Sequence, residues 1–329
     1  MNLHFVTDTK IIRFVEQHTA EDIDRQHQLF TNSSWAWIVQ TALLIRSAGF
    51  SVSLSNDFEP RAINLALADK LRRMPRRRDV FVVSIDADQL RPRWVNLSIV
   101  QNQRQTGRSA YWIPHWPQPG LIQRSPERQT FSHMGFFGLT RHLYRNENWW
   151  HKVCGEYGMR FSVRPPTQWH DYSDVDIAVG IRNMSRKRFH EKPPTKLFNA
   201  WLAGVVFIGG IDSAYSQVGV AGQDYLVAED EKTLIDQLGR LQRDAALGSS
   251  LILAGQQKTR TVGSRTSTLQ AWIELMEQHI IPKFEQWHTQ SSIRKHLAFS
   301  LGICGDAAIR GRNELWRRFK RFRQSHLVS

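Results

Sequence analysis

The chain has few cysteines, no long hydrophobic run and fewer acidic than basic residues. Its 329 residues include only 2 cysteines, Cys154 and Cys304, which cannot supply the disulfide framework of a small secreted domain. No apolar run is long enough to cross a bilayer. The N-terminus lacks the basic lead and apolar stretch of a signal peptide. These absences predict a protein of the reducing cytoplasm.

Several cofactor motifs are absent as well. The sequence has no Gly-x4-Gly-Lys-Ser/Thr loop and no Gly-x-Gly-x-x-Gly, so it carries no signal for a nucleotide hydrolase or a dinucleotide oxidoreductase. Its 13 histidines show no His-x3-His spacing, and its cysteines show no Cys-x2-Cys spacing. The sequence therefore predicts no metal site and no bound cofactor.

Apolar strands alternate with helical patterns along the first third of the chain. Helices are expected at residues 35–47, capped by Ser33 or Ser34, and at residues 64–74. Short apolar runs predict strands at residues 3–7, 51–54, 80–85, 97–100 and 110–113. Strands that alternate with helices are typical of a parallel sheet.

The second half begins again in the same way. Residues 134–141 form a strand pattern that ends in glycine and leads through a basic loop into a helix expected at residues 144–157. This is how a Rossmann-like domain begins. Further strands are expected at residues 160–163 and 224–227, and helices at residues 231–243 and 269–281.

A proline-rich stretch at residues 114–130 separates the two halves and predicts a linker. The predicted fold is therefore α/β with two Rossmann-like domains. They span residues 1–122 and 123–290, and a basic helical tail follows at residues 291–329.

The most informative segment is residues 190–215. Pro193 and Pro194 suit the start of a helix, where a missing N–H has no effect, and Gly204 suits its end. Residues 205–208 form a buried strand pattern. Two glycines then allow a sharp turn, and Asp212 or Ser213 can cap the next helix.

Two helix N-termini at one sheet edge form a site for an anion such as phosphate. The first helix offers its first backbone N–H at Thr195, and Lys192 and Lys196 add positive charge at the same end. Asn199 shares a face with Lys196 at 3–4 spacing. The alternative is a buried helix whose lysines are merely solvated.

Residues 195–206, Thr-Lys-Leu-Phe-Asn-Ala-Trp-Leu-Ala-Gly-Val-Val, resemble the donor-site signature of GT-B glycosyltransferases. They are similar to the Thr-Glu-Lys-Leu…Ala…Ala-Gly-Val-Val-Pro stretch of fucosyltransferases. They also resemble the Glu-x7-Glu…Ala-Ala-Gly-x-Pro block of the large retaining family. The whole chain resembles uncharacterised bacterial, largely cyanobacterial, GT-B-like glycosyltransferases.

The resemblance implies a donor site. The lysine of the signature, which contacts the diphosphate or ribose of the donor, matches Lys196. Arg141 matches the basic residue after the opening turn that binds the donor phosphates, although taken alone it reads equally well as a surface arginine. Arg164 is placed near the nucleobase and Arg182 near the sugar or phosphate.

The sequence departs from the signature at two positions. The Glu-x7-Glu pair falls on Glu191 and Asn199, so the second carboxylate is missing, and Val206 replaces the usual proline. The resemblance also implies that a late helix crosses back onto the first domain, and residues 269–281 are the matching segment.

Two acidic pairs are candidate metal ligands. Asp86 and Asp88 have the Asp-x-Asp spacing that chelates manganese in the other glycosyltransferase fold, GT-A, but here the pair fits a loop at a strand end. Asp174 and Asp176 fit a capping role at a strand entry.

An inverting transferase needs a general base on the first domain. Asp8 after the first strand, Glu59 after the second and His115 near the linker are the candidates. A retaining enzyme needs no base in that role.

The excess of positive charge, +14 at pH 7, is concentrated in two segments. One is the arginine-rich stretch at residues 72–78. The other is the tail at residues 310–323, where Leu315, Trp316, Phe319 and Phe322 share one side of a helix among arginines. The tail suits an anionic membrane surface, an RNA or acidic polymer, or simple packing on the body.

The sequence thus predicts a metal-independent glycosyltransferase that moves a sugar from a nucleotide-diphosphate donor to an unknown acceptor, which is a glycan, a lipid or a small molecule. It is expected in the cytoplasm or peripherally at the inner membrane face, and nucleic acid is not the expected partner. The alternative is a non-catalytic GT-B-like protein that binds an anionic surface or polymer through its basic tail.

Overall fold

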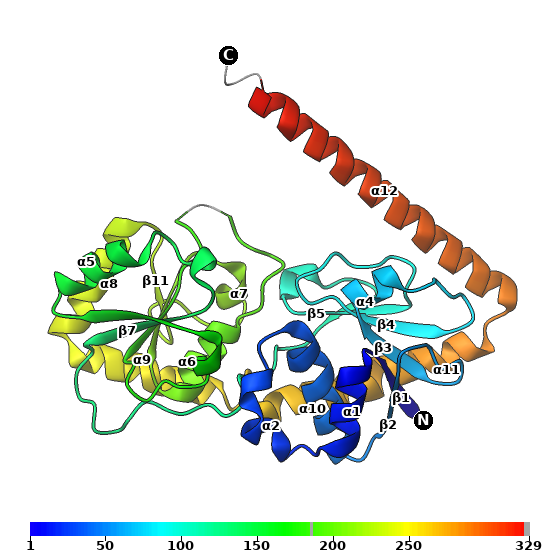
Figure 1. The fold of residues 1–329 in the computed structure, drawn as a ribbon, viewed down its shortest axis with the longest axis horizontal. Helices are drawn as coiled ribbons and strands as arrows, with labels where there is room; N and C mark the ends of the chain where they lie inside the picture. Colours follow the sequence, from blue (N-terminus) through cyan, green and yellow to red (C-terminus); the bar gives the residue numbers. More distant parts are fainter. Residues whose placement is uncertain (185–186, 326–329) are drawn as a thin grey trace.

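The computed structural model describes residues 1–184 and 187–325, which form two α/β units side by side (Figure 1). The first unit is built on a six-stranded sheet in the order β2-β1-β3-β4-β5-β6, with every neighbouring pair parallel. Its strands are β1 (Asn2–Val6), β2 (Ser51–Ser55), β3 (Ile63–Leu67), β4 (Phe81–Ile85), β5 (Leu97–Val100) and β6 (Ala110–Trp112).

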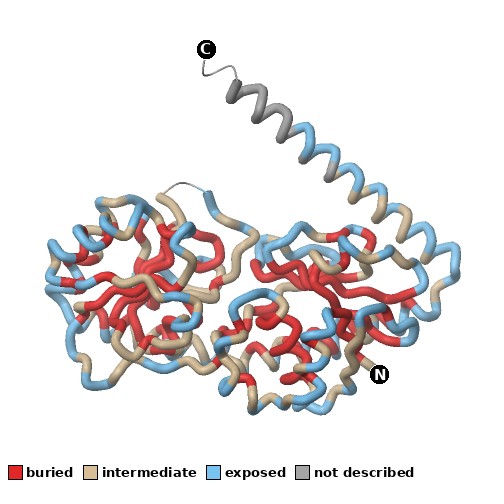
Figure 2. Tube along the Cα trace, viewed as in Figure 1, coloured by how far each residue is buried: buried red, intermediate tan, exposed pale blue. Residues whose placement is uncertain are grey.

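The second unit has a five-stranded parallel sheet in the order β11-β10-β9-β7-β8. Its strands are β7 (His133–Phe137), β8 (Arg160–Arg164), β9 (Ile177–Gly180), β10 (Val206–Gly209) and β11 (Leu226–Val227). Buried residues are concentrated in both sheets and in the helices that cover them (Figure 2). The predicted fold class, two Rossmann-like α/β units with a C-terminal helix, is confirmed.

One predicted helix is wrong in its first half. Residues 63–67 form the buried strand β3 between β1 and β4, and only α4 (Ala68–Arg73) is helical. A short apolar run fits a helix and a covered strand equally well, so its pairing with two neighbours decides. Asn64 fits the buried strand because its amide donates to three carbonyl oxygens, including that of Phe81 at 3.1 Å.

Helices flank the first sheet. The expected helix at 35–47 is present, but it begins with the π-helical turn Ser34–Val39 and continues as α3 (Gln40–Ser47). Its cap is Asn32, whose side-chain oxygen accepts from the Ser34 and Trp35 N–H groups. α1 (Thr9–Gln17) and α2 (Asp22–Arg25) complete this layer.

The segment at 190–215 folds as expected. α6 (Thr195–Ala203) starts after the two prolines and ends at Gly204, whose φ of 70° is left-handed. β10 follows, and Asp212 caps α7 (Ser213–Ser216) by accepting from the Ala214 N–H at 2.9 Å. The remaining helices of the unit are α5 (Glu147–Gly155), α8 (Glu231–Arg243) and α9 (Ala245–Lys258).

The chain then crosses back to the first unit. α10 (Arg265–Leu275), the π-helical turn Met276–Ile280 and α11 (Ile281–Thr289) bury apolar side chains in the first core, among them Trp272. The crossing that the resemblance implied is therefore present. Residues 265–289 therefore pack on the first unit, and the part of the chain that packs in the second unit ends before residue 265 rather than at residue 290.

The last helix, α12 (Ser292–Ser325), starts on the first unit and then leaves the body (Figure 1). Phe299 packs edge-on against Trp94 with ring centroids 6.0 Å apart, and Asp306 accepts from the Arg93 N–H at 2.8 Å. The side chains of Trp316, Phe319 and Phe322 lie outside the described part of the chain. Within residues 1–184 and 187–325, no helix combines the length and apolarity that a membrane span requires.

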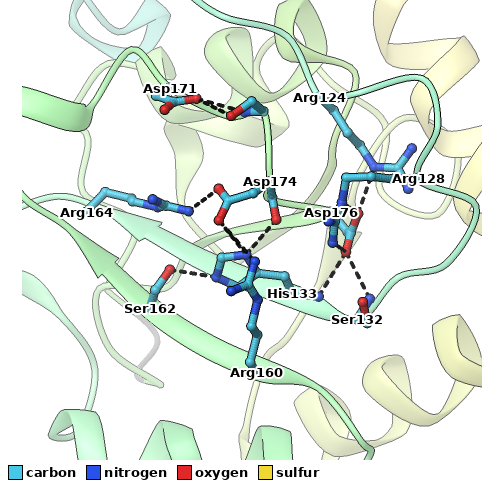
Figure 3. Close-up of polar contacts among 11 residues, drawn as sticks. Arg124, Arg128, Ser132, His133, Arg160, Ser162, Arg164, Asp171, Asp174 and Asp176 are labelled. Atoms are coloured by element: carbon cyan, nitrogen blue, oxygen red, sulfur yellow. Dashed lines mark hydrogen bonds and ion pairs between the residues drawn. The ribbon is translucent and has the colours of Figure 1, made fainter.

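The linker is tied to the second sheet by a buried carboxylate (Figure 3). Asp176 is fully buried, and it accepts from Arg124 and Arg128 and from the backbone N–H groups of Ser132 and His133. Burial by itself raises the pKa of Asp176, but these hydrogen bonds outweigh it and lower the pKa below 3.8. The carboxylate thus stays charged in the folded protein.

Replacing Asp176 with Asn is expected to lower the free energy of unfolding by about 3–5 kcal/mol, because two arginines lose a buried partner. Since the folded pKa is depressed, this contribution is present above pH 4 and disappears as the pH falls through the folded pKa. Urea denaturation at pH 7 measures the loss. The control is Asp174→Asn, whose carboxylate is 41% exposed and which we expect to change stability by less than about 1 kcal/mol. Equal losses in the two variants would contradict the assignment.

Candidate functional site

A cavity of about 510 Å³ lies between the two units, where the carboxyl ends of strands from both sheets face each other. The first unit contributes residues 30–33, Ala36, Asp88 and His115. The second contributes the loop after β7, residues after β9 and the start of α6. Ligands of open α/β sheets bind at this edge, so the cavity is the candidate site.

Lys196 is the central cation of the cavity. It lies in the first turn of α6, where Thr195 and Lys196 also present N–H groups that have no partner within the helix. Its Nζ sits 4.7 Å from the centre of the Phe136 ring. A Cβ on Gly138 would lie 2.7 Å from this nitrogen, so the glycine makes room for it. Burial, followed by repulsion from Arg182, lowers the pKa of Lys196 to about 7.

Arg182 approaches the same space from the end of β9. Its Nε donates to the Asp212 carboxylate at 2.9 Å, and its guanidinium lies 5.7 Å from the ring centre of Phe189. Asp212 is 3% exposed and also caps α7. The ion pair with Asp212 therefore holds Arg182 at the start of α7, and the Phe189 ring contacts it from the loop before α6. Burial raises the pKa of Asp212 even though Arg182 opposes this effect.

Two further cations lie at the rim. Arg141 is exposed in the loop after β7. Lys192 precedes α6, and its Nζ forms an ion pair of 2.8 Å with Asp88 of the first unit. The pKa of His142 reflects the positive charge of these side chains. Its pKa is lowered first by burial and then by Arg141, Arg182, Lys192 and Lys196. Four predicted donor-binding cations therefore converge on one cavity.

Asn199 lines the cavity but is also engaged with the protein. Its side-chain oxygen accepts from the linker N–H of Gln118 at 3.0 Å, and it hydrogen-bonds the Tyr172 hydroxyl. Asn199, which stands where the large retaining family has a glutamate, thus connects α6 to the linker.

Ser213 lies outside the cavity lining, at the contact between the units. Its hydroxyl accepts from Asn102 of the first unit at 3.1 Å, and Asn102 also donates to the Lys192 carbonyl at 3.0 Å. Its position supports a role in holding the two units together.

Arg164 also lies outside the cavity lining. It forms an ion pair with Asp174 on the face of β8, beside Arg160 (Figure 3). The structure therefore does not bring this predicted nucleobase contact together with Lys196.

The three base candidates lie in different places. Asp8 is exposed and paired with Lys70 at 2.6 Å, outside the cavity lining. Glu59 lies before β3, at the opposite edge of the sheet, where its carbonyl accepts from Asn64. Only His115 lines the cavity.

His115 is oriented by its neighbours. Its Nδ1 lies 2.6 Å from the Trp116 carbonyl oxygen, which fixes the proton on Nδ1 and leaves Nε2 as an acceptor. Burial lowers the pKa of His115, so the neutral imidazole is favoured.

The structures similar to this chain identify its fold. No protein-family model matches the chain, and no curated protein matches it in sequence. Sucrose-phosphate synthase from Thermosynechococcus elongatus superposes with a TM-score of 0.54 at 10% identity, over 86% of this chain and 100% of that one. HepE from Anabaena, in complex with UDP and glucose, superposes with a TM-score of 0.50 at 11% identity, over 84% of this chain and 100% of that one.

The chain has the GT-B fold. A third structure, TarM of S. aureus, aligns over 72% of this chain but only 58% of its own length, with 11% identity and a TM-score of 0.47. The cavity described above is therefore the cleft between the two α/β units of this GT-B fold.

The side chains of Asp86 and Asp88 have different partners and lie in different surroundings. Asp86 is buried against Ser84 and Arg91, and burial raises its pKa to about 6. Asp88 instead faces Lys192 across the cleft. No group of three or more His, Cys, Asp or Glu side chains in the described part of the chain is arranged to hold a metal ion.

Sequence reasoning missed several residues of the cleft. Ser33 was predicted only as a possible helix cap and residues 30–32 were given no role, yet residues 30–33 form part of the first-unit wall of the cavity. Phe137 and Tyr172 stack with ring centroids 3.8 Å apart in another wall. Phe189 lies beside Arg182 with a left-handed φ of 47°, which no sequence pattern indicated.

The affinity of the cleft for inorganic pyrophosphate is expected to depend on the charge of Lys196. Lys196 loses its proton as the pH rises through about 7, so the ratio of wild-type affinity to that of Lys196→Met should fall between pH 6 and pH 9. The comparison cancels the titration of pyrophosphate itself. Isothermal titration calorimetry at several pH values measures both affinities. A ratio that stays constant would contradict the assigned pKa.

Proposed function

We propose that this chain is a glycosyltransferase that moves a sugar from a nucleotide-diphosphate donor to a hydroxyl-bearing acceptor. The observation that carries the proposal is the convergence of Lys196, Arg182 and Arg141 on one cleft of the GT-B fold. The UDP named with HepE makes a uridine diphosphate sugar the first donor to test.

The departure of the leaving group is the step that needs positive charge. The bond between the anomeric carbon and the β-phosphate oxygen breaks, and the nucleoside diphosphate leaves with the electron pair. We propose that Lys196, Arg182 and the free N–H groups at the start of α6 stabilise the negative charge that grows on this phosphate. Because these groups supply the charge, the reaction is proposed to need no divalent metal ion.

The acceptor hydroxyl forms the new bond to the anomeric carbon and must lose its proton. In an inverting reaction we propose that Nε2 of His115 takes this proton, since His115 lies in the cleft wall contributed by the first unit. The loop at 30–33 of the same wall offers polar side chains, Asn32 and Ser33, for the acceptor.

Replacing Lys196 with Met should reduce affinity for the preferred nucleoside diphosphate by about tenfold to hundredfold, because a charged hydrogen bond is lost at similar side-chain volume. Thermal-shift and calorimetric titration with UDP, GDP, CDP and dTDP, each with magnesium and with a chelator, measure the effect. Lys232→Met on α8 of the same unit is the control and should bind like the wild type. A Lys196→Met variant of unchanged affinity would falsify the site assignment.

Replacing His115 with Gln should leave nucleotide affinity within about twofold but reduce turnover of the nucleotide sugar by about a hundredfold or more. Release of nucleoside diphosphate in the presence of candidate acceptors measures turnover. Wild-type turnover in His115→Gln would exclude the imidazole as the base. Nucleotide binding without turnover in the wild type would favour the non-catalytic alternative.

A further inference from the structure

The outer face of α12 exposes an unusual amount of apolar surface. Of the nine large apolar side chains that stand out as exposed in the described part of the chain, four lie on this helix: Ile293, Leu297, Leu301 and Leu315. Their exposed fractions range from 56% to 73%. Figure 2 shows that much of the helix is exposed.

These side chains form one continuous stripe. At 3.6 residues per turn, Ile293, Leu297, Leu301, Cys304, Ala308 and Leu315 fall within an arc of about 80°. We call this set the outer stripe. The sequence continues the same spacing at Phe319 and Phe322.

The outer stripe points away from the side of α12 that contacts the body. Phe299 and Ile303 pack against the cluster that contains Trp94, and they lie about 200° around the helix from Leu297 and Leu301 respectively. Gly302 allows this close contact, because a Cβ there would meet the Arg93 carbonyl oxygen at 2.4 Å. The base of α12 is therefore anchored by one face, while the outer stripe faces solvent.

The charge of the helix identifies the partner. Only Asp306 and Glu314 are acidic within residues 292–325, against nine basic residues: Arg294, Lys295, Arg310, Arg312, Arg317, Arg318, Lys320, Arg321 and Arg323. A second copy would bring two such helices together with strong like-charge repulsion. An anionic lipid surface offers both opposite charge and an apolar layer.

We propose that the outer stripe of α12 binds the surface of an anionic bilayer, with the helix lying in the headgroup region. Basic side chains contact lipid phosphates while the stripe enters the upper acyl region. The surface is separate from the nucleotide cleft, so this proposal stands or falls independently of the proposed transferase activity.

The test is co-sedimentation of the full chain with vesicles. One set contains phosphatidylglycerol and phosphatidylcholine in a 1:3 ratio, and the other contains phosphatidylcholine alone. We expect binding to the anionic vesicles only, weakened several-fold at 0.5 M salt. The double variant Leu297→Glu, Leu301→Glu should bind at least tenfold more weakly. The matched control is Leu253→Glu on α9, a leucine that is 58% exposed on the other unit, and it should bind like the wild type.

Circular dichroism and thermal denaturation of the variants verify that they are folded. Two results would overturn the proposal. One is equal binding of the double variant and the wild type to anionic vesicles. The other is no vesicle binding together with a dimer, seen by sedimentation velocity without lipid, that the double variant dissociates. The second result would assign the outer stripe to contact between copies of the chain.

Discussion

The structure depends on holding positive charge at the junction of two units where water is partly excluded. Burial disfavours the charged form of Lys196, and repulsion from Arg182 on the same side of the cleft adds to this effect. The surroundings compensate in specific ways. Asp212 pairs with Arg182, Phe136 presents its ring to the ammonium of Lys196, and Gly138 leaves space for it. An anionic ligand would relieve the repulsion, so the same arrangement that disfavours the empty cleft favours binding.

The cleft exists because several contacts fix the two units against each other. Asp88 reaches Lys192, and Asn102 reaches both the Lys192 carbonyl and Ser213. On the linker side, Asp24 pairs with Arg265 at the start of the crossover. The crossover helices then bury Trp272 in the first core. All of these contacts are polar except the burial of Trp272. The crossover helices therefore supply an apolar attachment to the first unit.

Sequence patterns predicted most of the architecture and part of the site. The prolines before α6, Gly204 and the short apolar run after it act locally, so their spacing was sufficient. The strand at 63–67 could not be separated from a helix, because its state depends on pairing with β1 and β4. Lys192 and Lys196 at the start of α6 were predicted from the helix-start pattern, and Arg141 on the loop after β7 was predicted by resemblance. The engagement of Arg164 by Asp174 and the position of Glu59 depend on tertiary contacts that spacing does not contain.

The most direct test of the central claim is a crystal structure of the chain with bound UDP. The account predicts diphosphate oxygens within hydrogen-bond distance, about 3 Å, of Lys196 Nζ and the Thr195 N–H, with Arg182 and Arg141 beside them. A nucleotide bound away from the start of α6, with Lys196 still unpaired, would contradict it.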